Sequence, residues 1–250
     1  MKIREINARS ILTRTNIPGG DYCLNPYVGC AHACRYCYAT FMSRYSGHIE
    51  PWGSFTDIKA NAVVLLRKAL RRKREGRVIV SSVTDPYQPV EATYEITRDC
   101  MELLGASDLE VSVLTKSRLV ERDIDLLKTT ANVEIGLTIT TDSEEVRRLM
   151  EPGASSIAER LAALKHLHEA GIPTYVFIGP ILPMRPEKLV EAVAPHADSI
   201  LIDRMNYRGK VSSIYARHKM EFALEDAYLE EMETRLVRHL THLGIPHQVV

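Results

Sequence analysis

Short apolar segments recur along the chain, and stretches whose apolar residues return every three or four positions separate them. Segments of this kind, rich in β-branched residues and ending at polar or glycine positions, are typical of buried strands. Five are predicted, at residues 77–83, 110–114, 133–139, 174–178 and 199–202. Strands that alternate with helices in this way predict βαβ units and a parallel sheet that helices cover.

Amphipathic spacing and capping residues locate the helices between these strands. The first is expected to start with Thr56 as N-cap, to carry Ile58 on its apolar face and to stop before Gly76. Ser156 and Glu159 have the spacing of a capping box at the start of a later helix. The remaining helices are expected at residues 97–104, 121–130, 143–150, 186–193 and about 224–240.

Polar, charged or glycine residues end each predicted strand. In parallel barrels the chemistry takes place at the carboxyl ends of the strands, which meet at one rim. The sequence therefore predicts that these side chains lie together. They are Ser82 and Thr84-Asp85, Thr115-Lys116-Ser117, Thr138 and Thr140, Gly179-Pro180, and Asp203-Arg204.

Three cysteines, Cys30, Cys34 and Cys37, lie within eight residues just before the first helix. A closed structural zinc site or a fully ligated iron–sulfur cube needs four protein ligands. Three thiolates on a cube leave one iron open to a small molecule, as catalytic metal sites do. The spacing alone leaves open a zinc site whose fourth ligand is His32, between the first two cysteines.

Composition narrows the class of protein. The chain has 250 residues, 45% of them hydrophobic, which suffices for one sizeable domain. Its 32 basic and 32 acidic side chains cancel, so no overall charge attracts nucleic acid or membrane. Five cysteines without a secretory signal, and no apolar run of about 18 residues, favour a cytoplasmic protein that does not enter a membrane.

The cysteine spacing, with Tyr36 before the last cysteine, resembles the signature of the radical S-adenosylmethionine (radical SAM) superfamily. The surrounding residues 25–39, Asn-Pro-Tyr-Val-Gly-Cys-Ala-His-Ala-Cys-Arg-Tyr-Cys-Tyr-Ala, are similar to the branch of spore photoproduct lyase. Further matches follow in order. They are Val-Thr-Asp-Pro-Tyr-Gln-Pro-Val-Glu (83–91), Leu-Thr-Lys-Ser (114–117), Arg-Asp-Ile-Asp-Leu-Leu (122–127), Glu151-Pro152 and Gly179-Pro180-Ile181.

The resemblance implies a partial (β/α)6 TIM-like barrel with the cysteine loop at the carboxyl rim of its strands. The sequence has no evident linker, internal repeat or low-complexity segment, which predicts a single domain over residues 1–250; the resemblance covers its core of about 17–203 and leaves a C-terminal extension of about 204–250. The resemblance also implies a [4Fe–4S] cluster held by Cys30, Cys34 and Cys37, with S-adenosylmethionine bound to the open iron. Reductive cleavage would give a 5′-deoxyadenosyl radical that takes hydrogen from a substrate, with flavodoxin or ferredoxin as electron donor.

The resemblance also assigns residues to S-adenosylmethionine. Lys116 is the candidate for its carboxylate, as a point charge. Thr84 and Thr138 offer hydroxyls to ribose or methionine groups. Gly179 permits close approach of the backbone to the adenine, and Tyr36 is the aromatic residue expected beside it.

One position departs from the branch. Spore photoproduct lyases carry there a cysteine that returns a hydrogen atom to the product, whereas this chain has Ser82. An O–H bond is too strong for such a donor, which argues against repair of DNA photoproducts by that route. Tyr87, Tyr38 and Cys100 are the candidates that remain for a catalytic donor.

Several alternatives stay open. A metal-stabilised, non-enzymatic binding module competes with the enzyme, and the substrate is either a nucleobase or nucleic acid, or a small metabolite or peptide. Cys23 and Cys100 are expected to be buried small hydrophobes. The basic residues between 67 and 74 are interpreted as the solvated outer face of a helix, with a nucleic-acid patch as the alternative. The pattern does not predict whether the chain forms oligomers.

Overall fold

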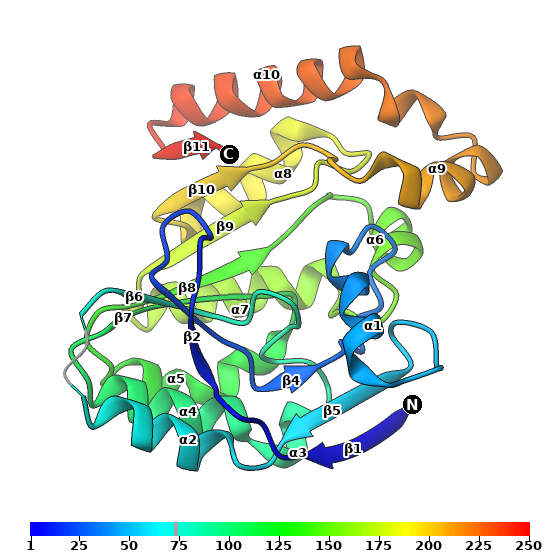
Figure 1. Ribbon diagram of the computed structural model, residues 1–250. Helices are drawn as coiled ribbons and strands as arrows, with labels where there is room; N and C mark the ends of the chain where they lie inside the picture. Colours follow the sequence, from blue (N-terminus) through cyan, green and yellow to red (C-terminus); the bar gives the residue numbers. More distant parts are fainter. Residues whose placement is uncertain (73–74) are drawn as a thin grey trace.

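A computed structural model describes residues 1–72 and 75–250 and arranges them around one large, mostly parallel sheet (Figure 1). The strand order is β11-β10-β9-β8-β7-β6-β3-β2, and only the β2–β3 pair among these is antiparallel. This confirms the predicted α/β fold, a partial TIM-like barrel. The strands are β2 (Leu12–Arg14), β3 (Tyr22–Leu24), β6 (Arg77–Val80), β7 (Glu110–Thr115), β8 (Val133–Thr138), β9 (Thr174–Ile178), β10 (Ser199–Ile202) and β11 (His247–Val249).

Helices surround the sheet in chain order, with α2 and α4 packed together at one edge and α10 on α8 at the other (Figure 1). The longer ones are α2 (Ala62–Leu70), α4 (Ile96–Gly105), α6 (Glu144–Met150), α7 (Ile157–Glu169), α8 (Pro186–Val193), α9 (Arg208–Arg217) and α10 (Asp226–Leu243). The single turns are α1 (Ser43–Ser46), α3 (Glu91–Tyr94) and α5 (Ile124–Leu127). The 3-10 turns are η1 (Tyr38–Met42), η2 (Arg118–Asp123), η3 (Ala194–His196) and η4 (Glu221–Leu224).

A second, small sheet corrects the first helix predicted from the sequence. Its order is β1 (Lys2–Ile6), β5 (Phe55–Lys59) and β4 (Tyr27–Val28). Thr56 and Ile58 therefore lie in a strand, and the helix starts five residues later than predicted, with Asn61 as its N-cap. Strand β5 is formed by pairing with β1, some fifty residues earlier in the chain, and local periodicity does not record such a partner.

Most other elements lie where the pattern predicts them, including the capping box of Ser156 and Glu159 at the start of α7. Two differ. Strand β6 ends at Val80 because Ser81 has a φ of +70°, which breaks an extended backbone. The helix expected over residues 121–130 is instead the 3-10 turn η2 followed by the single turn α5.

The sheet brings the strand ends to one rim. Lys116 follows β7, Thr138 ends β8, Gly179 follows β9 and Asp203 follows β10, so four neighbouring strands each contribute a residue. Beyond them, residues 204–250 form α9, α10 and β11, and β11 adds a parallel strand next to β10. Within the described residues, every helix is too short or too polar to cross a membrane.

Candidate active site

A cavity of about 720 Å³ opens at the carboxyl ends of the strands. Ligand pockets commonly measure about 300–1,000 Å³, so this one suits a small molecule. It brings together the three cysteines and the strand-end residues, which are far apart in the sequence. Of the residues predicted for the site, its lining includes Cys30, Cys34, Cys37, Tyr36, Tyr38, Thr84, Lys116, Thr138 and Gly179.

The cysteine loop is held by side chains from the segment after β6. The carbonyl oxygen of Gly29 accepts hydrogen bonds from Thr84 Oγ1 at 2.6 Å and from Gln88 Nε2 at 3.2 Å. The backbone N–H of Ala31 donates to Gln88 Oε1 at 2.9 Å. On the other side, a Cβ at Gly153 would lie 2.2 Å from the carbonyl oxygen of Ala31, so the loop 151–155 presses directly against it. The loop is therefore positioned before any cofactor binds.

The three cysteines are free thiols in a largely buried setting. Burial raises the pKa of Cys30 well above its usual value and that of Cys34 to about 12, although the charge of Lys116 opposes the second shift. Burial also raises the pKa of Cys37, and the indole N–H of Trp52, which is buried without another hydrogen-bond partner among the described residues, opposes that rise. N–H groups directed at cysteine sulfur are the kind of neighbour that tunes iron–sulfur clusters. The donor set therefore fits such a cluster.

The described residues do not gather His32 and the three cysteines around one point, as a zinc site with His32 as fourth ligand would need. His32 is buried, and its Nδ1 lies 3.3 Å from Asp85 Oδ2, within ion-pair distance but without a hydrogen bond. Zinc would draw its sulfur ligands to within about 3.8 Å of one another around one ion. Residues 1–72 and 75–250 contain no group of three or more His, Cys, Asp or Glu side chains placed around one ion. A cube spreads Cys30, Cys34 and Cys37 over three irons, and does not need that convergence.

Lys116 supplies a positive charge to the cavity. Its Nζ lies 5.8 Å from the ring centroid of Tyr36, a cation–π contact. Its charge opposes the rise in the pKa of Cys34 and helps to lower the pKa of Glu151. In the described part of the chain no carboxylate lies within ion-pair distance of this ammonium, which leaves it available to an anionic ligand.

Tyr36 and Thr138 are tied to one buried ion pair. The Tyr36 hydroxyl donates to Glu151, and Thr140 Oγ1 donates to the same carboxylate at 3.1 Å. Arg160, fully buried on α7, reaches Glu151 Oε2 at 2.5 Å and donates through Nη1 to the carbonyl of Thr138 at 2.9 Å. Burial favours the neutral form of Glu151, but the charges of Arg160 and Lys116 and the Tyr36 hydrogen bond together outweigh it and hold the pKa below its usual value.

Asp85 joins two strand ends to the cysteine loop. It accepts from Thr115 Oγ1 at 2.7 Å, from the backbone N–H of Lys116 at 2.8 Å and from that of Tyr87 at 2.9 Å, and it faces His32. Burial alone would raise the pKa of Asp85, but His32 and these donors lower it to about 2. The carboxylate therefore fixes the backbone from which Lys116 projects.

Three further predicted ligand contacts differ in whether protein atoms already occupy them. They are Thr84, Thr138 and Gly179. The Thr84 hydroxyl already donates to the cysteine loop and accepts from Gln88 Nε2 at 2.9 Å. Thr138 is buried at the cavity wall. A Cβ at Gly179 would lie 2.2 Å from the ring of Phe177, so the missing side chain makes room for that ring. Their contacts with S-adenosylmethionine stay predictions.

A thiol lies next to Ser82 even though Ser82 is not a cysteine. Cys23 Sγ, from β3, is 3.0 Å from Ser82 Oγ, and Asn25 Nδ2 donates to the same sulfur at 3.2 Å. The Tyr38 hydroxyl donates to the carbonyl of Ser82. Cys23 is buried, as the sequence predicts, but its position beside Tyr38 and Ser82 follows only from the pairing of β3 with β6.

The three candidates for a catalytic hydrogen donor differ in whether they reach the cavity. Tyr38 lines the cavity, whereas Tyr87 and Cys100 are fully buried in the core and outside its lining. Burial raises the pKa of Cys100 to about 12. Sequence reasoning missed Arg160 and Trp52, because an arginine on a helix and a tryptophan in a loop carry no local sign of their buried partners.

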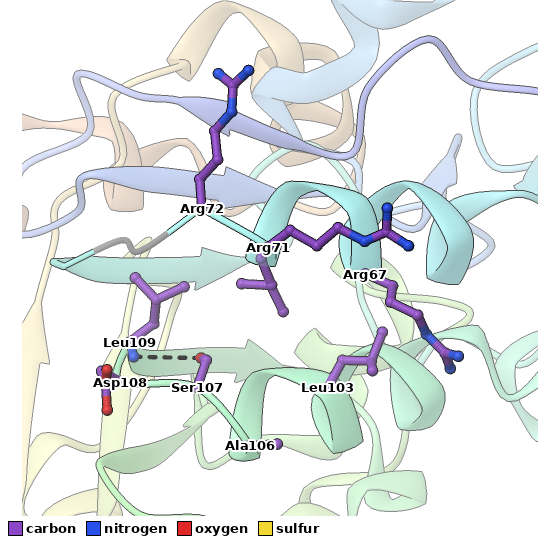
Figure 2. Close-up of a pocket in the computed structure, with 9 residues that line it drawn as sticks. Arg67, Arg71, Arg72, Leu103, Ala106, Ser107, Asp108 and Leu109 are labelled. Carbon is purple, nitrogen blue, oxygen red and sulfur yellow. Dashed lines mark hydrogen bonds between the residues drawn. The ribbon is translucent and has the colours of Figure 1, made fainter.

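The basic residues around the end of α2 lie on the outer surface, away from this cavity. Arg67, Arg71 and Arg72 border a separate hollow of about 330 Å³, and in Figure 2 their guanidinium groups extend in different directions. Side chains that diverge do not form a shared anion site. Lys73 and Arg74 of the same run lie outside the described residues.

Comparison with known proteins agrees with this geometry. The profile described as "Radical SAM superfamily" matches residues 24–194, most of the chain. An uncharacterised protein of Methanocaldococcus jannaschii is 34% identical over 235 residues, covering 93% of this chain and 86% of that protein. A "Radical SAM Nalpha-GlyT isomerase" of Pseudomonas phage M6 is 26% identical over 73% of this chain, which spans 35% of that enzyme.

Solved structures confirm the fold. A structure of a spore photoproduct lyase mutant superposes with a TM-score of 0.71 at 17% identity, covering 99% of this chain and 81% of that one. Another structure of the same lyase contains bound AdoMet (S-adenosylmethionine) and a dinucleoside spore photoproduct. The cysteine loop, the strand-end cavity and the profile match together show that the chain belongs to the radical SAM superfamily.

Proposed function

We propose that the protein binds a [4Fe–4S] cluster through Cys30, Cys34 and Cys37 and S-adenosylmethionine in the adjoining cavity. When bound, the reduced cluster supplies one electron that breaks the C5′–S bond, so that methionine leaves and the 5′ carbon takes a hydrogen atom from the substrate. The electron comes from a flavodoxin- or ferredoxin-type donor. The observation that carries this proposal is that three thiols and one unpaired lysine line the same cavity.

The chain's own residues orient the nucleoside. Lys116 presents a charge to the methionine carboxylate, and a charge-assisted bond of this kind is among the stronger hydrogen bonds in proteins. Glu151 and Arg160 hold Tyr36 and Thr138 at the cavity wall through direct hydrogen bonds. Thr84 acts mainly on the cysteine loop, since both of its hydroxyl bonds are made within the protein.

We infer that the reaction is not photoproduct repair by the route of spore photoproduct lyase, because Ser82 offers an O–H where that route needs a thiol. Tyr38 and the thiol of Cys23 lie on either side of Ser82 and are the groups nearest to that position that can donate hydrogen. The superfamily includes an enzyme named an isomerase, which shows that its members differ in outcome. A reducing cytoplasm would keep all five cysteines as thiols.

Anaerobic reconstitution with iron and sulfide tests the proposal. The wild-type protein should bind close to four iron and four sulfide, and should form 5′-deoxyadenosine from S-adenosylmethionine when dithionite is added. Replacing Cys34 with alanine should abolish both signals. Cys100→Ala is the matched control, since it removes one thiol outside the cavity and should retain both.

Metal content distinguishes the proposed enzyme from the alternative, a zinc-stabilised binding module. Zinc at one equivalent in protein purified without oxygen, with no iron uptake and no 5′-deoxyadenosine, would contradict the enzyme and support a zinc-stabilised module. Loss of both signals in Cys100→Ala as well as Cys34→Ala would show that general thiol loss, and not ligation, is responsible.

A further inference from the structure

The chain has a single tryptophan, Trp52, and it lies beside the cysteine loop. Trp52 lines the cavity together with Cys37. Its Nε1 is buried, and among the described residues it has no other hydrogen-bond partner than that thiol. A buried donor without a partner is costly. Burial raises the pKa of Cys37 and the indole N–H opposes that rise, so the N–H is directed at the sulfur.

The strength of this contact depends on the state of the sulfur. A neutral thiol is a weak hydrogen-bond acceptor. A cysteine that holds a metal is a thiolate. Hydrogen bonds to an ionised acceptor are about twice as strong as those between neutral groups. The indole N–H therefore gains a good partner only when Cys37 acts as a ligand.

The loop that carries Trp52, residues 47–54 between α1 and β5, packs directly on the cysteine loop. Gly53 has a φ of +94°, and a Cβ there would collide with the Cβ of Ala33. The ring of Trp52 meets that of Phe55 edge-on, at 90° with centroids 6.0 Å apart. A Cβ at Gly29, just before the first cysteine, would collide with the same phenylalanine. The two loops are therefore in close contact around Phe55.

Charged side chains of the loop and of the small sheet hold loop 47–54 in place. The side chain of His48 is fully buried, and both of its ring nitrogens face carboxylates. Nδ1 lies 3.0 Å from Glu50, and Nε2 lies 2.8 Å from Asp57. The ring also stacks on Phe55, with 4.0 Å between centroids. Glu50 pairs in turn with Lys2 of β1 at 2.7 Å. The loop is thus tied to both β1 and β5.

Arg4 of β1 completes this set of contacts. It donates to the two carboxylate oxygens of Asp57, each at 2.9 Å, and to the carbonyl of Ser46 at 3.0 Å. Asp57 is 2% exposed, so its two partners, Arg4 and His48, compensate a buried carboxylate. In Figure 1, β1 and β5 lie side by side below α1, the turn that Ser46 ends. We call this set the charged clamp. It consists of Arg4, His48, Glu50 and Asp57.

We propose that the charged clamp positions Trp52 so that its indole N–H bonds the sulfur of Cys37 and raises the reduction potential of the cluster. Hydrogen bonds to the sulfurs are among the factors that set the potentials of iron–sulfur clusters, and they favour the reduced state because it carries more negative charge. Trp52 is thus a positioning residue rather than a catalytic one. The inference rests on the proposed function, since it requires Cys37 to be a ligand.

The reduction potential of the reconstituted holoenzyme, without S-adenosylmethionine, is measured by redox titration with EPR detection. Trp52→Phe removes the N–H and keeps a ring. It should shift the reduction equilibrium about 2- to 10-fold toward the oxidised cluster, the range for one hydrogen bond. A tenfold shift corresponds to about 59 mV for one electron. Tyr45→Phe, on the exposed turn α1, is the matched control and should keep the wild-type potential.

A second replacement separates the N–H from the size of the ring. Because Trp52 is the only tryptophan, growth of a tryptophan auxotroph on benzothienylalanine alters this position alone. Sulfur then stands in place of the N–H in a ring of nearly the same shape. This protein should show the same shift as Trp52→Phe. It also keeps the test decisive if Trp52→Phe does not fold.

The clamp is tested away from the cavity with Arg4→Met. This variant should lower the potential by itself and should add no further shift to Trp52→Phe, because both act through one contact. In the apo-protein, the fluorescence of Trp52 should move to longer wavelength in Arg4→Met, since a displaced indole meets water. Arg185→Met is the matched control. It breaks the ion pair with Asp142 at the start of α8 and should change neither signal.

Three results overturn the inference: an unchanged potential in both Trp52→Phe and the benzothienylalanine protein, a full additional shift when Arg4→Met is combined with Trp52→Phe, or equal fluorescence changes in Arg4→Met and Arg185→Met. Iron content and 5′-deoxyadenosine are measured on the same preparations. A wild-type protein that assembles the cluster and forms 5′-deoxyadenosine, but whose potential ignores Trp52, contradicts only this inference. A wild-type protein that assembles no cluster contradicts the proposed function and, with it, this inference.

Discussion

The two walls of the cavity are built in different ways. The wall at the strand ends is a closed network in which Asp85, Glu151 and Arg160 are buried and each makes several hydrogen bonds. The wall from the C-terminal segment exposes Tyr207 and Asn206. A closed polar network holds one geometry, because every broken bond leaves a buried group without a partner. The first wall is thus suited to a constant cofactor and the second to a substrate that must enter and leave.

The largest effect should follow from breaking the buried ion pair. Arg160→Met leaves Glu151 buried without its cation and should lower the free energy of unfolding by about 3–5 kcal/mol. Urea unfolding of the apo-protein measures this. The double variant Arg160→Met with Glu151→Gln should recover part of the loss, because no uncompensated charge remains.

Lys165→Met is the control for that variant, since it removes an exposed cation from the same helix. Its contact with Glu169, 3.7 Å long, is on the surface and should be worth less than about 0.5 kcal/mol. Equal losses in Arg160→Met and Lys165→Met would show that the strand-end wall is no more rigid than the surface.

The next effect concerns the charge that this wall presents. Lys116→Ala should raise the dissociation constant of S-adenosylmethionine about 10- to 100-fold, as expected for one bond to a charged group. Lys116→Arg keeps the charge and should raise this dissociation constant less. Equilibrium dialysis of the reconstituted protein measures both, with iron content determined in parallel. Unchanged affinity in Lys116→Ala at full iron content would remove Lys116 from the site.

Lowering the pH should reduce the free energy of unfolding through protonation of Asp85, which lies in the same wall. Its pKa of about 2 lies below the value near 3.9 of an unfolded aspartate, so its ionised form stabilises the fold above pH 4. That stability is lost as the pH falls from about 4 toward 2. The difference in unfolding free energy between wild type and Asp85→Asn should therefore shrink by about 1 kcal/mol between pH 5 and pH 3. A constant difference would contradict the lowered pKa.

The smallest effect is expected outside both walls. Arg67→Ala and Arg71→Ala remove exposed side chains of the hollow in Figure 2 and should change the free energy of unfolding by less than about 0.5 kcal/mol. The yield of 5′-deoxyadenosine should stay at the wild-type level. A clear fall in that yield would show that the outer face of α2 takes part in the reaction.

Elements with strong local signals were predictable. The strand at 174–178 and the helix at 186–193 have the predicted bounds, because an apolar run and a proline at the first helical turn act within a few residues. The wrong start of the first helix shows the limit of that approach. Strand β5 exists because β1 lies beside it, and residues 55–58 are buried by that pairing and by the packing around it.

The residues of the site also fall into two groups, those that local sequence predicts and those that only the fold brings together. The spacing of Cys30, Cys34 and Cys37 within one loop was enough to predict a metal centre, since neighbours in sequence are neighbours in space, and the resemblance to a family added the open position. The partners that hold the loop and the strand ends, Gln88 and Arg160 among them, come from distant segments. Nothing near them in the sequence marks them, because their role depends on which groups the fold buries beside them.

The sequence by itself determined the alternating strands and helices and the loop of three thiols, and its resemblance to a family predicted the cofactor chemistry. Only the tertiary structure decided that Cys23 lies beside Ser82, that Arg160 supports Tyr36 through Glu151, and that Tyr207 faces Tyr38 across the cavity mouth. Local patterns reflect backbone preferences and short-range spacing. These contacts instead depend on the pairing of strands and the return of the C-terminal segment, which bring residues up to about 170 positions apart together.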